Sequence, residues 1–161
     1  MKRSLLVEGH GRPLAAVVAA ANVPDDRLLA ATIAALVLER PEPEPDWPQH
    51  LAIDAAYDTP TGWETTVDAD YYPHIAPRRP ADPPPPPDPP YPARRWVVER
   101  AHRWLVSWRA ILVRWERNAE NSLGLIELAC ALLWGRYYLQ LAPARRGCAR
   151  AYAIRSLTTV T

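Results

Sequence analysis

The 161-residue sequence lacks several features that would point to particular classes of protein. It has no run of about 20 apolar residues, the length that a membrane-spanning helix requires. Its first residues lead through Lys2 and Arg3 into a short strand-like run and a turn, rather than into the long apolar core of a signal peptide. The two cysteines, Cys130 and Cys148, are too few for a disulfide framework or a zinc set. We therefore expect a protein of the reducing cytoplasm with no membrane partner.

Phenylalanine is absent and lysine occurs once, which we interpret as a compositional bias without functional meaning. Proline is abundant instead: there are 19, about twice the usual share of about 5%. Thirteen of them fall within residues 41–48 and 80–92. The second tract is predicted to be an extended polyproline segment, because proline cannot donate a hydrogen bond to a helix or sheet.

Charge is divided unevenly along the chain. Residues 1–92 carry seven basic and fourteen acidic side chains, a net charge of −7, whereas residues 93–161 carry twelve basic and four acidic ones, a net charge of +8. Such asymmetry suggests a polyanionic partner for the basic part, with nucleic acid favoured over a membrane surface. Internal pairing between the two oppositely charged parts explains the same pattern equally well.

The order of the predicted elements indicates an α/β protein that ends in helices. Two apolar runs flanking the turn Gly9–Pro13 predict a β-hairpin. Further elements are predicted as a helix from Asp25 or Asp26 to Leu38, a strand at 51–53, a short helix at 61–68, a strand at 71–75, and helices from Arg94 and over 119–141. We divide the chain into a sheet with its crossover helix (1–79), a proline-rich linker (80–93), a basic helix pair (94–141) and an irregular basic tail (142–161).

The helix that begins at Arg94 has apolar residues at spacings of three and four. These positions predict a buried stripe. The stripe comprises Val97, Ala101, Trp104, Trp108, Ile111 and Trp115, widened by Leu105 and Leu112.

Two carboxylates are candidates for chemistry. Asp54 directly follows a predicted buried strand, at the edge where open α/β sheets place their ligands. Glu99 lies in the first turns of the basic helix. Each also has an ordinary structural interpretation: Asp54 as a turn-forming residue, and Glu99 as part of a solvated face on which it pairs with Arg95 and Arg103. The residues alone favour these ordinary interpretations.

Other catalytic patterns are missing from the sequence. The four histidines show no metal-ligand spacing, no serine lies in a nucleophile elbow, and there is no glycine-rich phosphate loop.

Taken in order, several segments resemble the DDE-type transposases of bacterial insertion sequences, in the IS-five-like branch of the IS-four superfamily. Lys2–Glu8 and Gly11–Asp25 resemble the hairpin of that family. Leu51–Asp58 is similar to its second-aspartate motif, and Arg94–Leu105 to its glutamate motif. Residues 112–121 and 128–133 continue the family's C-terminal pattern.

The resemblance implies an RNase H-like fold with a C-terminal helix pair. The fold consists of a meander of strands, a crossover helix, a strand bearing the second aspartate and a late helix bearing the glutamate. Three carboxylates would hold two magnesium ions for DNA cleavage and strand transfer. Asp54 would be the second aspartate and Glu99 the glutamate. Four basic residues would meet DNA phosphates, namely Arg94, Arg95, Arg100 and Arg103.

The resemblance also implies that the fold is incomplete. The family's first aspartate lies on a strand that precedes the Lys2–Glu8 segment, so the first strand is expected to be missing and the sheet to expose an edge. We therefore expect a transposase fragment with an incomplete two-Mg²⁺ site, inactive alone, that binds insertion-sequence ends at the nucleoid. An upstream product could supply the first aspartate, and oligomers are possible. The alternative is a degenerate, non-catalytic module for DNA binding or protein interaction.

Overall fold

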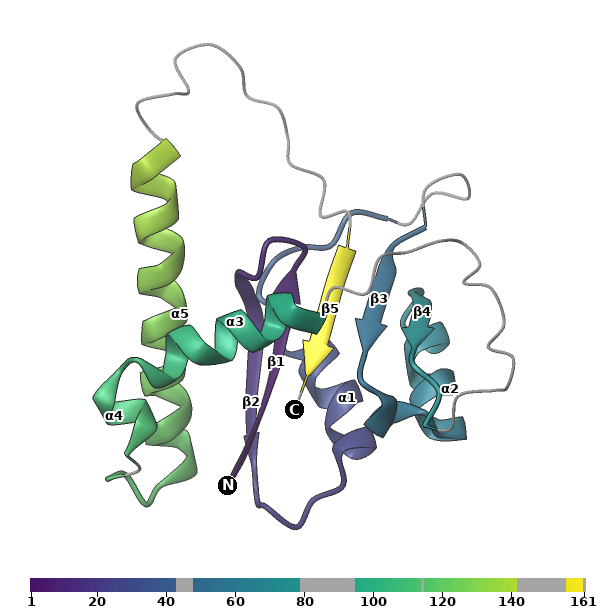
Figure 1. Ribbon diagram of the computed structural model, residues 1–161, viewed down its shortest axis with the longest axis horizontal. Coiled ribbons are helices and arrows are strands. Elements are labelled where there is room, and N and C mark those ends of the chain that lie inside the picture. Colours follow the sequence, from purple (N-terminus) through teal and green to yellow (C-terminus); the bar gives the residue numbers. More distant parts are fainter. Residues whose placement is uncertain (43–47, 79–94, 114, 142–155, 161) are drawn as a thin grey trace.

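A five-stranded mixed sheet lies at the centre of the protein, with strand order β2-β1-β5-β3-β4 (Figure 1). The computed structural model describes residues 1–42, 48–78, 95–113, 115–141 and 156–160. The strands are β1 (Lys2–Glu8), β2 (Pro13–Ala19), β3 (His50–Ile53), β4 (Tyr72–Ile75) and β5 (Ser156–Val160). The helices are α1 (Asp25–Ala34), η1 (Ala55–Tyr57, a 3-10 turn), α2 (Pro60–Asp68), α3 (Arg95–Val106), α4 (Arg109–Leu112) and α5 (Ala119–Leu141). This confirms the predicted α/β class.

Strands β1 and β2 form the predicted antiparallel hairpin, in which Lys2 pairs with Ala19 and Leu6 with Ala15. The turn is closed by backbone hydrogen bonds from Glu8 N to Arg12 O (2.9 Å) and from Gly11 N to Glu8 O (2.7 Å). Gly11 has φ +84°, a left-handed conformation in which a side chain would be strained. The glycine therefore allows the chain to reverse within this short turn.

Strand β3 and its parallel neighbour β4 are joined by η1 and α2, which provide the crossover that parallel pairing requires. Helix α2 begins where its chemistry predicts: the Thr59 hydroxyl accepts a hydrogen bond from Gly62 N (3.1 Å), and Pro60 occupies the first turn. The predicted strand at 51–53 and the predicted short helix at 61–68 are thereby confirmed.

The largest difference from the sequence prediction is β5. Residues 156–160 were expected to belong to an irregular tail, but they form a strand between β1 and β3 (yellow in Figure 1). This strand is antiparallel to β1 and parallel to β3. The edge of β1 that was expected to be exposed is therefore paired.

Alternation along β1 divides the buried residues between the two faces of the sheet. On one face, Leu6 packs with Leu29 of α1 and with Leu51 and Ile53 of β3. On the other face, Leu5 and Val7 of the same strand belong to a second cluster. Its other buried members are Val97, Val98, Ala101 and Leu105 of α3, and Ile126 and Ala129 of α5. The sheet therefore lies between α1 on one side and α3 with α5 on the other.

The long basic helix differs from its prediction in length and in its buried face. It ends at Val106, and a separate turn, α4, follows. Of the predicted stripe, Val97, Ala101 and Leu105 are buried. Exposed instead are Trp104, Trp108, Leu112 and Trp115. The bounds of α5 agree with the helix predicted over 119–141. Helix α1 ends at Ala34, earlier than its predicted end at Leu38.

Helix α1 also begins without the predicted aspartate cap, because its N-cap residue is Pro24 and no side chain caps it. Asp25 instead forms an ion pair with Lys2 of β1, which ties the start of the helix to the sheet. The predicted linker at 80–93 lies outside the described residues, as does most of the predicted tail. None of the described helices combines the length and apolar character needed to span a membrane.

Candidate active site

Asp54 lies immediately beyond β3, where the sequence predicted a carboxylate at the C-terminal edge of a parallel strand. Its side chain is half-buried and accepts a hydrogen bond from Ala55 N (2.6 Å). It thereby caps the 3-10 turn η1, which ends in the fully buried Tyr57. Asp54 thus has the turn-forming role that its ordinary interpretation predicted, and its position at the sheet edge is also as expected.

The neighbouring Asp58 has a different environment. Its carboxylate accepts hydrogen bonds from Arg78 N (3.0 Å) and from Trp63 Nε1 (3.2 Å). These hydrogen bonds, with that from the Arg78 backbone N–H the largest cause, hold the pKa of Asp58 below its usual value. Asp58 thereby anchors the chain that leaves β4 and stabilises the loop beside Asp54.

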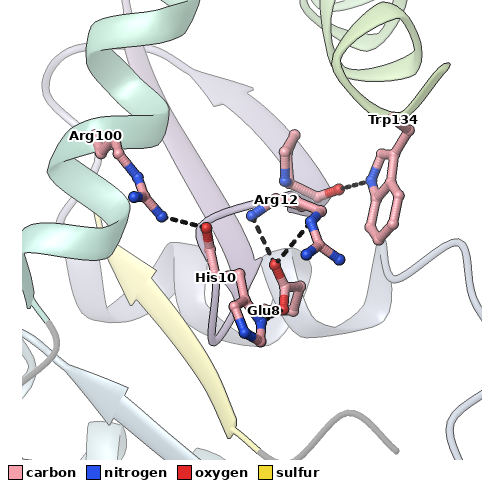
Figure 2. Close-up of polar contacts among 6 residues, drawn as sticks. Glu8, His10, Arg12, Arg100 and Trp134 are labelled. Atoms are coloured by element: carbon pink, nitrogen blue, oxygen red, sulfur yellow. Dashed lines mark hydrogen bonds and ion pairs between the residues drawn. The ribbon is translucent and has the colours of Figure 1, made fainter. Parts of the chain in front are cut away.

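Glu99 lies in the first turns of α3 and is exposed, next to the buried Val98. The helix is fixed beside the β1–β2 turn by its neighbour Arg100, whose Nη2 donates a hydrogen bond to His10 O (Figure 2). The Arg100 guanidinium also lies between two indole rings, 4.9 Å from the ring centroid of Trp96 and 5.1 Å from that of Trp104. Stacking of this kind restricts the arginine and the helix turn that bears Glu99.

The β1–β2 turn is held in shape by the acid at its start. Glu8 is buried, and its carboxylate accepts hydrogen bonds from Arg12 N (3.1 Å) and pairs with His10 Nδ1 (2.9 Å) (Figure 2). The guanidinium carbon of Arg12 lies 3.3 Å from the ring centroid of Tyr137 on α5. Trp134 of the same helix donates from Nε1 to Pro13 O (2.6 Å). One turn therefore positions both α3 and α5.

This turn cluster of Glu8, His10, Arg12, Arg100 and Trp134 was not predicted as a unit. The sequence places Glu8 at the hairpin turn, but Trp134, which donates to Pro13 O at the end of this turn, lies more than a hundred positions away. The only local signal is the four-residue spacing of Glu8 and Arg12, whose charged groups lie 3.6 Å apart. Gly11 contributes as well, because a Cβ there would lie 2.9 Å from Val97 O of α3. The helix approaches the turn this closely only because position 11 has no side chain.

The strand register locates the two candidate acids relative to each other. Glu8 at the end of β1 pairs with Leu157, which pairs with Leu51 of β3. Asp54 lies three residues further along β3, which is about 10 Å along the strand direction. Arg100, the neighbour of Glu99, contacts the turn beyond Glu8. The segments bearing Asp54 and Glu99 therefore lie at different levels of the sheet.

The capacity of this arrangement to bind a metal ion depends on the type and number of its ligand atoms. Carboxylate oxygens such as those of Asp54 and Glu99 are of the type that Mg²⁺ prefers. Within the part of the chain that the structure describes, however, no three His, Cys, Asp or Glu side chains gather closely enough to hold a metal ion. The residues present thus suit the ion in kind, but they do not form a complete site.

The predicted DNA-contacting arginines have different surroundings. Arg103 is exposed on α3, whereas Arg100 is half-buried against the turn and the two indoles. Arg94 and the side chain of Arg95 lie outside the described part of the structure. Trp96 and Trp104 are 57% and 36% exposed, respectively, so aromatic and basic groups share the outer surface of this helix.

The family model described as "Transposase DDE domain" matches residues 1–134. The chain therefore belongs to the family of DDE-domain transposases. The matched range includes β1 to β4, α3 and most of α5, and hence both candidate acids.

The chain is also similar to a protein from Burkholderia cepacia named "Putative transposase for insertion sequence element IS402". The two sequences are 31% identical over 141 residues, which cover 82% of this chain and 61% of the relative. The chain therefore spans about three fifths of the length of that relative. No solved structure matches the chain.

Proposed function

We propose that this chain provides catalytic-domain residues for DNA transposition by an insertion-sequence transposase of the IS-five-like branch. The main support is the match of a DDE-domain family model to the segments that bear Asp54 and Glu99. The position of Asp54 beyond a parallel strand and the exposed carboxylate of Glu99 on α3 are compatible with an RNase H-like domain that handles DNA. Such a substrate would place the protein at the nucleoid.

In this proposal Asp54 is the second aspartate and Glu99 the glutamate of the DDE set. Their segments lie at different levels of the sheet in this structure, so joint binding of Mg²⁺ with a third carboxylate would require the Asp54 loop and the Glu99 turn to approach each other. The ion would then supply activation of the attacking oxygen and stabilisation of the leaving one during phosphodiester cleavage. Because two of the three acids are assigned in this chain, we propose that it is inactive alone. The part of this chemistry that its own residues perform is to orient the two carboxylates: Ala55 N fixes Asp54, and the Arg100–His10 hydrogen bond fixes the helix turn of Glu99.

The proposal is tested by a Mg²⁺-dependent cleavage and strand-transfer assay in which the chain is part of a complete transposase. Asp54→Asn and Glu99→Gln are each expected to lower the rate at least about 100-fold, because a metal-binding carboxylate would be lost. Asp70→Asn and Glu127→Gln are matched controls, since both acids are exposed and lie away from the proposed site. Full activity of both test variants would contradict the assignment.

The outer surface of α3 is the proposed DNA interface. Its exposed Arg103 and the indoles of Trp96 and Trp104 offer a cation for phosphates and flat rings for contact with bases or sugars. Arg100 would act as a positioning residue, because its guanidinium is engaged by His10 O and both rings. Arg94 and Arg95, adjacent in sequence, would extend this basic surface.

Arg103→Ala is expected to weaken binding to duplex DNA and to reduce the slope of log affinity against log salt concentration by about 1, because one phosphate contact is lost. Arg27→Ala is the matched control: Arg27 is also exposed, but it lies on α1, which covers the opposite face of the sheet. Equal effects of the two substitutions would contradict an interface on α3.

A second candidate function is a DNA-binding module without catalysis. The observation that favours it is the absence, within the described residues, of a three-residue metal-binding cluster. DNA binding that depends on Arg103 but is never followed by cleavage, even in a complete transposase, would select this alternative.

A further inference from the structure

Strand β5 connects two halves of the sheet that do not otherwise pair with each other. In the described residues, β1 pairs with β2 and β5, and β3 pairs with β4 and β5. The residues of β5 from Leu157 to Val160 pair with β1, and those from Ser156 to Thr159 pair with β3. Removal of β5 would therefore leave a groove with an unpaired backbone edge on each side, about two strand spacings or 10 Å wide.

The two halves would remain associated without β5, because they share a buried core. Leu6 and Leu14 from the β1–β2 half cluster with Leu51 and Ile53 from the β3–β4 half around Leu29 of α1. The groove is thus bounded by elements whose side chains pack without the help of β5. Because β1 and β3 run in opposite directions, a strand between them forms one antiparallel and one parallel ladder, and β5 is antiparallel to β1 and parallel to β3.

The same position is the one that a strand preceding β1 in a meander would take. Consecutive strands of a meander pair as antiparallel neighbours. One edge of β1 is already paired with β2, the strand that follows it. A strand that precedes β1 must therefore use the other edge, and that edge is paired with β5.

We propose that the groove between β1 and β3 is a strand-binding site that the chain fills with its own residues 156–160. Because only one strand fits between the two edges, β5 excludes any other segment from the groove. The identity of the excluded segment rests on the proposed function: it is the strand that bears the family's first aspartate. The chain would then regulate its own site by strand complementation, the mode in which an extended segment is added to open sheet edges.

Disulfide trapping tests the position of β5 in the full-length chain. Val7 and Thr158 are paired in the register. In a Cys130→Ala/Cys148→Ala background, Val7→Cys with Thr158→Cys should form an intramolecular disulfide at least about tenfold faster than Lys2→Cys with Thr158→Cys. The control pair is too distant, because Lys2 lies five residues or about 17 Å further along β1 and a disulfide requires Cα atoms within about 7 Å. Leu5→Cys with Val160→Cys, also paired, provides a second test pair if the first variant folds poorly.

A synthetic peptide of residues 150–161 tests whether the groove accepts a strand from outside. The peptide should slow the intramolecular disulfide of the Val7→Cys/Thr158→Cys chain in proportion to its concentration, because it competes with β5. The same peptide with Thr158→Pro should have no effect, since proline cannot donate to either ladder.

Equal trapping rates for the test and control pairs, disulfides formed only between two copies, or no slowing by the peptide would each overturn the proposal. These measurements involve neither DNA nor metal. Their failure would leave the transposition assay unaffected, and an inactive transposase would leave the strand-binding site intact.

Discussion

At the scale of single residues, the loop after β3 depends on one close backbone approach. Gly62 lies in the first turn of α2, directly over the carbonyl group of Tyr57. A Cβ at position 62 would lie 2.1 Å from Tyr57 O, far inside van der Waals contact. The obstacle is backbone at the end of η1, which cannot rotate away as a side chain could. The loop that carries Asp54 therefore depends on a glycine eight residues further along the chain.

We expect Gly62→Ala to lower the free energy of unfolding by about 1–3 kcal/mol, as overpacking of a filled site does. Thermal unfolding followed by circular dichroism measures the change. Gly124→Ala on α5 is the matched control: no atom would lie within 4 Å of the added Cβ, so the substitution should stabilise the helix by up to about 1 kcal/mol. Destabilisation by both substitutions to the same extent would show that the Tyr57 contact is not the cause.

At the scale of secondary structure, β3 and β4 bring two histidines together on the face opposite Leu51 and Ile53. His50 Nδ1 lies 2.8 Å from His74 Nε2 of the neighbouring strand. Tyr72 adds a ring whose centroid is 5.5 Å from that of His50. Burial lowers the pKa of both histidines, and the charge of His50 lowers that of His74 further. The fold therefore favours the neutral form of both imidazoles.

The stability of the sheet should consequently depend on pH. The pKa of each histidine is lower in the folded protein than the value of about 6.5 in the unfolded chain, so the unfolded chain binds more protons as the pH falls through that value. The midpoint of thermal unfolding is therefore expected to be lower at pH 5 than at pH 8. The double variant His50→Gln/His74→Gln should show a smaller decrease. An unchanged decrease would mean that other groups cause it.

The sequence predicted most elements correctly where the local pattern alone decides the structure. The β1–β2 hairpin, α2 and α5 all have turn or capping residues, or a long apolar segment, that specify them locally. The prediction of which face of α3 is buried was wrong for the tryptophans. They occur at helical spacing, but they are exposed on the outer side of the helix, where Trp104 lies beside Arg100. Periodicity identifies a helix and an apolar side. It does not show which of two neighbouring stripes meets the sheet.

Strand β5 was missed for a different reason. The local signal is short, the β-branched run Thr158–Val160, and it follows a long segment without periodicity. Its strand conformation depends on two ladders with β1 and β3, whose residues lie more than a hundred positions earlier in the sequence. The candidate acids were noted from their positions in the predicted elements and assigned their roles from motif resemblance. The different levels of their segments relative to the sheet follow from the strand register and could not be predicted from the sequence.

At the scale of the whole molecule, α1 is the element that makes the two halves of the sheet one folding unit. Its Leu29 is fully buried and belongs to a cluster with residues of both halves. The Thr32 hydroxyl, also buried, donates to Ser4 Oγ of β1 (2.7 Å), which fixes the helix over the first half. Loss of packing at the centre of this cluster should therefore affect distant strands together.

We expect Leu29→Ala to lower the free energy of unfolding by about 2–5 kcal/mol, because it removes buried methyl groups and leaves a cavity between the halves. Hydrogen exchange should then accelerate in β2 and β4 to a similar extent, although these strands lie at opposite edges of the sheet. Val37→Ala is the control, since Val37 is 84% exposed and its truncation should change stability by no more than about 0.5 kcal/mol. Acceleration confined to one half would contradict this role of α1, because it would mean that the two halves unfold separately.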